Sequence, residues 1–336
     1  MSAEPDLRLA ESHAVDGALH TDPNPLAAAR GGALRVVVRA RDLTWSLLSL
    51  ATDARRLAPD VKVQLDLPLS LVACGDFWLI AGSSGEEWKL IAFDDAGRLV
   101  HDWTTPSWTV PLCVAGHPAA VLWADQGARV AVTHPRDAFG EPTWVALCNT
   151  TQMEGVAALR DGVAVVRAGA FDRPVEIIDV SDGKIRARTR IAGTEGAVAP
   201  SLAAAGDRLF SLWAMPGRLM LQAFDAALRP DGAPIELTTL RVPHSFDRSF
   251  AAARSDGRLV VGYVDRERTG VVRAARGAPV TYRKSTWAAV YNPTSGSVGT
   301  FHAVDEHSEA PCLWVGDRLV VLTPAIGALR MNLWEA

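Results

Sequence analysis

Short apolar runs separated by Gly-centred turns recur along the whole chain. The clearest copies are LSLVACGDFWLIAG (69–82), PLCVAGHPAAVLW (111–123), SLAAAGDRLFSLW (201–213) and EAPCLWVGDRLVVL (309–322). Weaker copies are PLAAARGGALRVVV (25–38), GVAALRDGVAVVR (155–167) and SFAAARSDGRLVVGY (249–263). Most copies place a Gly-Asp, Asp-Gly or Gly-Gly pair between two apolar runs, and such pairs accept the positive φ of a tight turn. Each copy therefore predicts a β-hairpin.

The spacing of the seven hairpins indicates a circular repeat. Their turn glycines are Gly31, Gly75, Gly116, Gly162, Gly206, Gly257 and Gly316, which lie 44, 41, 46, 44, 51 and 59 residues apart. Periods of about 40–50 residues are typical of propellers, whose four-stranded blades need that much chain. Segments 87–105, 175–191 and 218–240 supply a third and a fourth strand after their hairpins. Helical periodicity is scarce, so the pattern predicts an all-β chain.

The last copy is too short to complete a blade by itself. Only ALRMNLWE (328–335) follows its hairpin as a third strand, and DLRLAES (6–12), within an N-terminal segment 1–23, can supply the fourth. Such pairing closes the ring and removes two open sheet edges. The chain thus resembles the seven-bladed β-propeller superfamily, as a single domain over residues 1–336. The resemblance concerns architecture only, because the WD dipeptide with its Gly-His, the kelch signature and the Asp box are all absent.

Composition narrows the classes of partner. A net charge of −4 and a pI near 6.1 disfavour nucleic acid and anionic membranes, which are bound mainly through excess Lys and Arg. The first thirty residues lack a secretory h-region and no apolar run reaches eighteen residues, so we expect a soluble cytoplasmic protein. The abundance of alanine favours a bacterial source. The four cysteines are far apart in apolar runs without a C-x-x-C pair, which favours reduced thiols. Standard nucleotide, zinc and hydrolase motifs are absent, so we expect no cofactor or resident metal.

The propeller resemblance implies that the segments leading into the innermost strands gather at one face, the usual ligand site of this fold. These segments contain histidines and carboxylates in similar relative positions: His20 with Asp22, Glu195, His244 with Asp247, His307 with Glu309, and Glu154 as a further candidate. Imidazoles and carboxylates can bind a metal or transfer protons. Ordinary turn capping and bonding between blades is the alternative interpretation.

The sixth repeat departs from the period. Between its expected second strand (258–263) and third strand (287–293) lies a basic insertion, 264–286, which should overhang the same face. The insertion carries Arg266, Arg268, Arg273, Arg276, Arg283 and Lys284 against two acids. Arginine-rich loops suit carboxylates, phosphates or acidic peptides, although a solvated loop or an oligomer contact is an alternative. Trp103 and Trp108 flank the segment leading into the third blade, where one of them can line the mouth of the ring.

Two functions follow. The first is a non-catalytic binding propeller that holds a peptide, small ligand or partner protein over its top face, for instance as an accessory protein of a biosynthetic pathway. The residues expected to bind are Arg266, Arg268, Arg283, Lys284, Trp108, His244 and His307. The rival is a lyase, hydrolase or cyclase, with or without a metal, that uses His20, His244 and His307 with Glu195, Asp247 and Glu309. A purely structural scaffold is a third interpretation.

Overall fold

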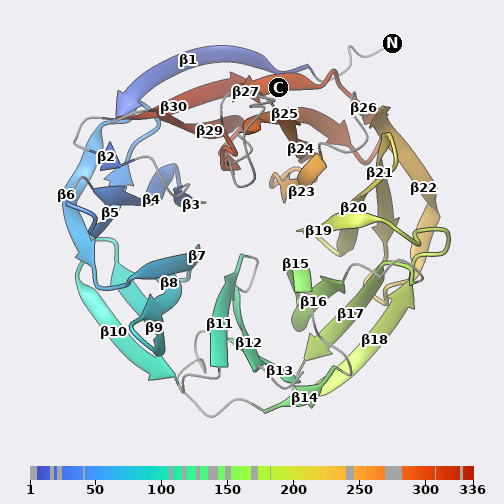
Figure 1. The fold of residues 1–336 in the computed structure, drawn as a ribbon, viewed down its shortest axis with the longest axis horizontal. Coiled ribbons are helices and arrows are strands. Elements are labelled where there is room, and N and C mark those ends of the chain that lie inside the picture. Colours follow the sequence, from blue (N-terminus) through green and yellow to red (C-terminus); the bar gives the residue numbers. More distant parts are fainter. Residues whose placement is uncertain are drawn as a thin grey trace, which may run out of the picture.

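The chain folds into seven antiparallel sheets arranged in a ring, with all-β secondary structure in its described residues (Figure 1). The computed structural model describes residues 6–15, 19–20, 25–40, 42–105, 109–115, 119–125, 129–134, 143–147, 153–167, 173–181, 183–239, 246–268, 282–306, 308–325 and 328–336. The seven innermost strands form a closed circle of neighbours, in the order β3, β7, β11, β15, β19, β23, β28 and back to β3. The predicted seven-bladed β-propeller is therefore confirmed.

Blades one to four follow the repeats. Blade one contains β2 (Leu19–His20), β3 (Leu26–Arg30), β4 (Ala33–Ala40), β5 (Trp45–Leu50) and β6 (Arg56–Val63). Blade two contains β7 (Leu67–Cys74), β8 (Phe77–Ser84), β9 (Glu87–Asp94) and β10 (Leu99–Thr105). Blade three contains β11 (Thr109–Val114), β12 (Ala120–Asp125), β13 (Arg129–Thr133) and β14 (Val145–Ala146). Blade four contains β15 (Met153–Leu159), β16 (Gly162–Arg167), β17 (Glu176–Ser181) and β18 (Lys184–Arg190).

Blades five to seven complete the ring. Blade five contains β19 (Val198–Ala205), β20 (Arg208–Met215), β21 (Arg218–Phe224) and β22 (Pro230–Thr239). Blade six contains β23 (Phe246–Ala253), β24 (Leu259–Arg268), β25 (Tyr282–Asn292), β26 (Ser297–Val298) and β27 (His302–Asp305). Blade seven contains β28 (Cys312–Val315), β29 (Arg318–Ala325), β30 (Ala328–Glu335) and the N-terminal β1 (Arg8–Val15).

Ring closure occurs as the sequence predicts, through the N-terminal strand. β1 pairs antiparallel with β30, from Arg8 opposite Glu335 to Val15 opposite Leu329. Strand β1 extends three residues beyond the predicted end at residue 12. Leu7 and Val15 are buried at its two ends, which anchors the strand at both.

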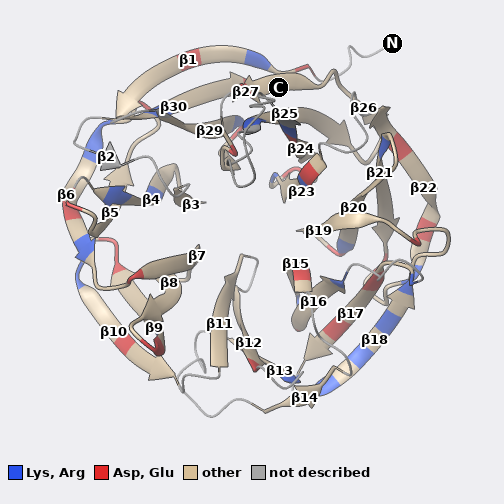
Figure 2. Ribbon diagram, viewed as in Figure 1, with Lys and Arg blue, Asp and Glu red and all other residues tan. Residues whose placement is uncertain are grey.

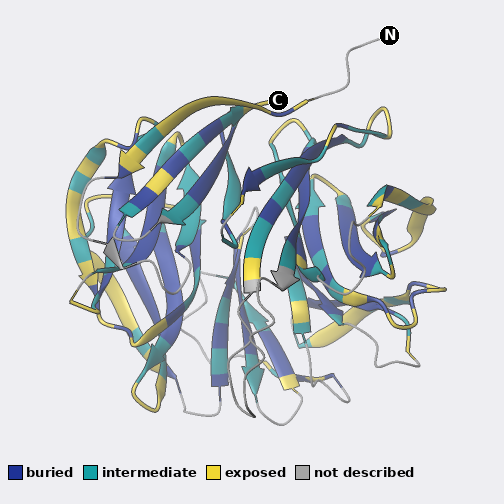
Figure 3. Cartoon of the chain, turned by 45° about the horizontal axis from the view of Figure 1, so that its top comes forward, coloured by how far each residue is buried: buried dark blue, intermediate teal, exposed yellow. Residues whose placement is uncertain are grey.

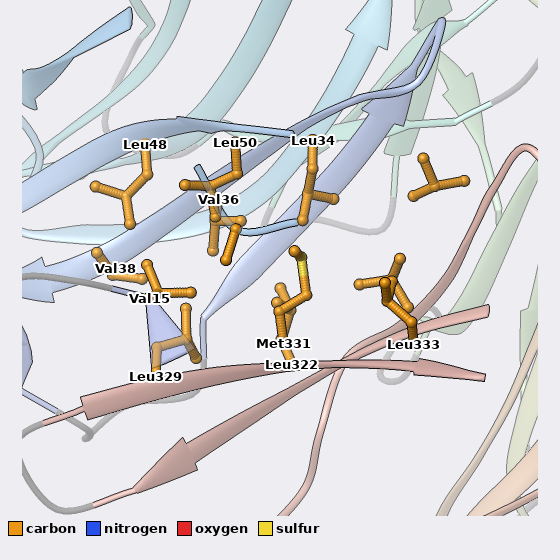
Figure 4. Packing of buried hydrophobic residues seen from close by; sticks show 13 residues of the cluster. Val15, Leu34, Val36, Val38, Leu48, Leu50, Leu322, Leu329, Met331 and Leu333 are labelled. Atoms are coloured by element: carbon orange, nitrogen blue, oxygen red, sulfur yellow. The ribbon is translucent and has the colours of Figure 1, made fainter. Parts of the chain in front are cut away.

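The core consists of one apolar cluster at each boundary between blades. The cluster between blades seven and one joins Leu34 and Leu50 of blade one to Val15, Leu322 and Met331 of blade seven (Figure 4). Buried residues lie within the ring and exposed residues mark its outer rim (Figure 3). The short side chains of the inner strands let seven sheets converge, whereas the second strands are almost fully apolar and fill the space between sheets.

The hairpin turns follow the prediction with one exception. Positive φ angles occur at Gly31, Gly75, Gly206, Gly257 and Gly316. Gly162 instead begins β16, after a turn at Arg160 and Asp161, and an added Cβ would lie 2.6 Å from the Val180 carbonyl oxygen. Glycine is needed at this position because the backbone of the neighbouring strand comes close, and not because the chain turns here. Gly116 lies outside the described residues.

The predicted insertion in blade six is partly strand. β24 continues to Arg268 and β25 begins at Tyr282, so the second and third strands extend into both ends of segment 264–286. The ladder pairs Arg266 with Lys284 and Glu267 with Arg283. Of these residues, Arg283 is exposed, whereas Arg266 and Lys284 are partly buried. Residues 269–281 lie outside the described part.

Candidate functional site

Four of the predicted polar residues meet at the top face, the face at which the innermost strands begin. Asp247 lies near the start of β23, Arg266 near the end of β24 and Lys284 near the start of β25. Glu309 precedes β28 of the neighbouring blade. Antiparallel pairing brings these strand ends to one edge, and oppositely charged residues adjoin on β23 (Figure 2).

Lys284 is the centre of this ion-pair network. Its Nζ lies 2.6 Å from Asp247 Oδ2 and 2.9 Å from Glu309 Oε2. Arg266 Nη2 lies 2.9 Å from Asp247 Oδ1, and Arg248 Nη1 lies 2.6 Å from Glu309 Oε1. We call Asp247, Arg248, Arg266, Lys284 and Glu309 the rim network. It links blade six to blade seven.

Electrostatics keep the central ammonium charged. Burial lowers the pKa of Lys284, but hydrogen bonds to Asp247 and Glu309 outweigh it, so the pKa rises above its ordinary value. The side chains of the two carboxylates are only 18% and 13% exposed, whereas the guanidinium side chains of Arg248 and Arg266 are far more exposed. The carboxylates therefore lie inside the network and the guanidinium groups lie outside.

A β-bulge explains how neighbouring residues Asp247 and Arg248 both reach the network. Phe246 pairs with Asp265 and Arg248 pairs with Val264, which leaves Asp247 as the extra residue. In a regular strand, successive side chains point to opposite faces, whereas a bulge re-aims one of them. Inner strands β7, β15 and β19 have similar irregularities near their starts. In these four inner strands, the bulges lie near the top face.

A second pair of residues adjoins the network. Arg283 donates through Nε to the Glu306 carbonyl oxygen at 2.8 Å, and its Nη2 lies 3.4 Å from the Glu306 carboxylate. The backbone of Arg268 pairs with Tyr282 in the β24–β25 ladder, and its side chain lies outside the described part. Arg283 thus adds a further exposed guanidinium beside the rim network.

Buried Thr286 fixes the segment that carries Glu309. Its Oγ1 accepts a hydrogen bond from the Ala310 amide at 2.9 Å and donates to the Ser308 carbonyl at 2.8 Å. Asp305 accepts hydrogen bonds from the Ser308 amide and hydroxyl, both at 3.0 Å. These contacts hold the segment before β28 against β25. Glu309 is therefore positioned before any ligand binds.

At the base of the β24–β25 extension, the side opposite the rim network is aromatic. Tyr263 stacks on Trp287 with ring centroids 6.3 Å apart and planes 5° apart. Phe246 and Phe301 lie 6.3 Å and 5.8 Å from Tyr263. These rings pack in the cluster between blades five and six. Alternation along β24 and β25 thus places the charged network toward blade seven and, at the base of the extension, the aromatic rings toward blade five.

Of the other predicted residues, Glu195 and Glu154 are described, and neither takes part in the rim network. Glu195 is exposed in the connection between β18 and β19. Glu154 lies at the bulge of β15, where burial raises the pKa of its carboxyl although the Ala199 amide donates to it. The backbone of His20 pairs with Arg39 in β2, and its side chain lies outside the described part. His244, His307, Asp22 and Trp108 lie outside the described residues altogether.

The burial of the tryptophans shows which of them belong to the core of the ring. Trp78, Trp123 and Trp213 are buried, as predicted, while Trp314 is half-buried and lies under Arg254. Trp103 stacks edge-on against Trp123 at 4.8 Å in the cluster between blades two and three. Trp103 therefore belongs to the core and not to the mouth of the ring.

Sequence reasoning missed Arg248, Thr286, Asp305 and Glu306. Arg248 is adjacent to Asp247, and ordinary strand alternation would point it away from the network. Thr286 resembles any strand threonine until its partners in the next blade are known. The signal that could have found Glu306 is its position three residues before Glu309 in an acidic segment.

The described residues contain no group of three or more His, Cys, Asp or Glu side chains that could hold a metal ion. Cys74, Cys113 and Cys312 are free thiols, and Cys148 lies outside the described part. Burial raises the pKa of Cys113 and Cys312 to about 12. Within the described segments, no helix is long and apolar enough to cross a membrane.

No protein-family model matches the chain, and no curated protein matches it. Solved propellers do resemble it. The WD40 domain of Toxoplasma gondii coronin has a TM-score of 0.59 and 14% identity, over 99% of this chain and 88% of that one. A catalytically inactive virginiamycin B lyase from Staphylococcus aureus, solved with quinupristin, has a TM-score of 0.57 and 10% identity, over 96% and 99%.

A puromycin-hydrolyzing peptidase from Mycobacterium tuberculosis has a TM-score of 0.55 and 15% identity over 91% of this chain. This chain spans about half of that peptidase, at 51%. At such identities the likeness concerns the fold alone, and the fold supports many functions. The protein is a seven-bladed β-propeller.

Proposed function

We propose that this protein is a non-catalytic binding propeller that holds a carboxylate-bearing partner, such as an acidic peptide, on its top face over blades six and seven. The supporting observation is that the positively charged groups in and beside the rim network point outward and the carboxylates point inward. Guanidinium groups of Arg248, Arg266 and Arg283 face solvent, while Asp247 and Glu309 are turned inward. Guanidinium groups bind carboxylates through paired hydrogen bonds.

Preorganisation supports the same proposal. Ion pairs and the Thr286 hydrogen bonds hold these side chains in place before a partner arrives. Long side chains that are already ordered lose less conformational entropy on binding. A partner carboxylate would then meet guanidinium groups whose positions are already fixed.

The same contacts argue against proton transfer by this cluster. A general base needs a free acceptor and a pKa near the working pH. Asp247 and Glu309 each bond two cations, and the raised pKa of Lys284 keeps it protonated. The enzyme alternative uses His20, His244 and His307 with Glu195, Asp247 and Glu309, and its three imidazole side chains lie outside the described part.

A binding assay with a defined probe tests the proposal. The probe is a fluorescein-labelled octapeptide of alternating Glu and Gly, followed by anisotropy at low salt. We expect the Arg266→Gln/Arg283→Gln double variant to bind roughly tenfold or more weakly, because two charge-assisted contacts of about 1 kcal/mol each are lost. Arg8→Gln/Arg55→Gln, which removes two cations from other parts of the ring, is the charge-matched control. If both double variants bind the peptide equally weakly, net charge alone explains the binding and the proposed site is wrong. Unchanged affinity in Arg266→Gln/Arg283→Gln would also overturn the proposal.

A further inference from the structure

A buried guanidinium lies between blades one and two, near the face opposite the rim network. Arg35 projects from β4 and is only 4% exposed. Its Nη2 donates to the Asp95 carbonyl oxygen at 2.6 Å, and its guanidinium lies 5.2 Å from the centre of the Trp78 ring. Its Nη1 is buried and has no hydrogen-bond partner among the described residues. Buried charged groups are normally paired and hydrogen-bonded.

A second unsatisfied polar group lies beside the first. Ser49 on β5 pairs directly with Arg35 in the sheet, so the two side chains are on the same face. Ser49 is also buried, and its Oγ has no hydrogen-bond partner in the described part of the chain. Directly opposed residues have Cβ atoms about 4.5–5.5 Å apart. A charged donor and a hydroxyl that can donate therefore adjoin, and neither has a hydrogen-bond partner among the described residues.

The local charges do not balance either. The Asp95 carboxylate bonds the guanidinium of Arg30 and accepts the Trp78 indole N–H at 2.7 Å. Neighbouring Asp94 bonds Arg98 at 2.7 Å. Arg30 and Arg35 thus share one carboxylate, which leaves one positive charge in a buried setting. An uncompensated buried charge is strongly destabilising.

We propose that a small monovalent inorganic anion of the chloride class binds between blades one and two, held by Arg35 Nη1 and Ser49 Oγ. The anion supplies the missing acceptor for both donors and balances the second guanidinium. Buried Val37 and Leu47 lie on the same face, in the apolar cluster shared with Trp78. The proposal is independent of the function proposed for the rim network.

Thermal denaturation at fixed ionic strength tests the anion site. We expect 100 mM chloride to raise Tm by about 2 °C or more over 100 mM gluconate, through preferential binding to the folded state. Arg35→Met should abolish this difference, and Ser49→Ala should reduce it while the guanidinium stays in place. Arg39→Met, on the same strand, is the matched control and should keep the chloride response.

A bromide-soaked crystal locates the ion directly. An anomalous peak within hydrogen-bond distance of Arg35 Nη1 and Ser49 Oγ would support the proposal, and this readout does not depend on the folding of any variant. A water molecule in that position, or a chloride response that persists in Arg35→Met, would overturn it.

Discussion

Replacing Lys284 with methionine probes the centre of the rim network, because methionine keeps most of the side-chain length and removes the charge. The ammonium bonds two carboxylates, at 2.6 Å and 2.9 Å. A hydrogen bond to a charged group contributes about 1.5–3 kcal/mol when buried. Since Lys284 is about one-third exposed, solvent screening reduces each contact to roughly 1 kcal/mol.

We therefore expect Lys284→Met to lower the free energy of unfolding by about 2 kcal/mol in urea titrations at pH 7. Lys62→Met is the control, because Lys62 is exposed and forms no ion pair within the described residues. A double-mutant cycle with Glu309→Gln should give a coupling energy of about 1 kcal/mol. A loss equal to that of Lys62→Met, together with zero coupling, would refute the assigned role of the network.

The pH dependence of this variant has a defined sign. The folded pKa of Lys284 is raised, so its stabilisation is fully present below the unfolded pKa and is lost as pH rises through the folded value. The stability gap between the native protein and Lys284→Met should be constant from neutral pH to about pH 10 and narrow above it. A gap that narrows between pH 6 and 8 would contradict the assignment.

Three further predictions concern the ring itself. Leu7→Ala, which truncates a buried anchor of the closing strand, should cost about 2–4 kcal/mol of unfolding free energy, whereas Leu9→Ala on the exposed side of β1 should cost less than about 0.5 kcal/mol; equal losses in urea would contradict closure by β1. Gly262→Ala should destabilise blade six by about 1–3 kcal/mol, because the added Cβ meets the Phe250 ring and the Trp287 carbonyl, and an unchanged urea midpoint would contradict that packing. A hydrogen bond from Arg254 lowers the pKa of Asp256 to about 2, so its stabilisation is present above pH 4 and fades as pH falls toward 2. In acid titrations from pH 4 to about pH 2, Asp256→Asn should lose less unfolding free energy than the native protein loses. An identical loss in both proteins would contradict a stabilising role of the Arg254–Asp256 pair.

Much of the ring was predictable because its signals are local. Apolar runs around Gly-centred turns specify hairpins, and the shortage of chain after Gly316 requires a strand from elsewhere. The convergence of Asp247, Lys284 and Glu309 also followed from strand polarity, since each precedes or begins a strand at the same face.

Other features depend on contacts that no local pattern contains. The participation of Arg248 depends on a bulge of one residue, which reverses the side expected from alternation. The strand character of 264–268 and 282–286 depends on pairing across an insertion. The unsatisfied donors of Arg35 and Ser49 are visible only when the partners of each buried atom are known.

Hydrogen–deuterium exchange with the Glu-Gly octapeptide tests most directly whether an acidic partner binds at the rim network. We expect slower amide exchange confined to residues 246–249, 283–286 and 308–311 when the peptide is bound. Protection instead at 184–190, where β18 carries Lys184, Arg186, Arg188 and Arg190 on the outer edge of blade four, or no protection anywhere at saturating peptide, would contradict it.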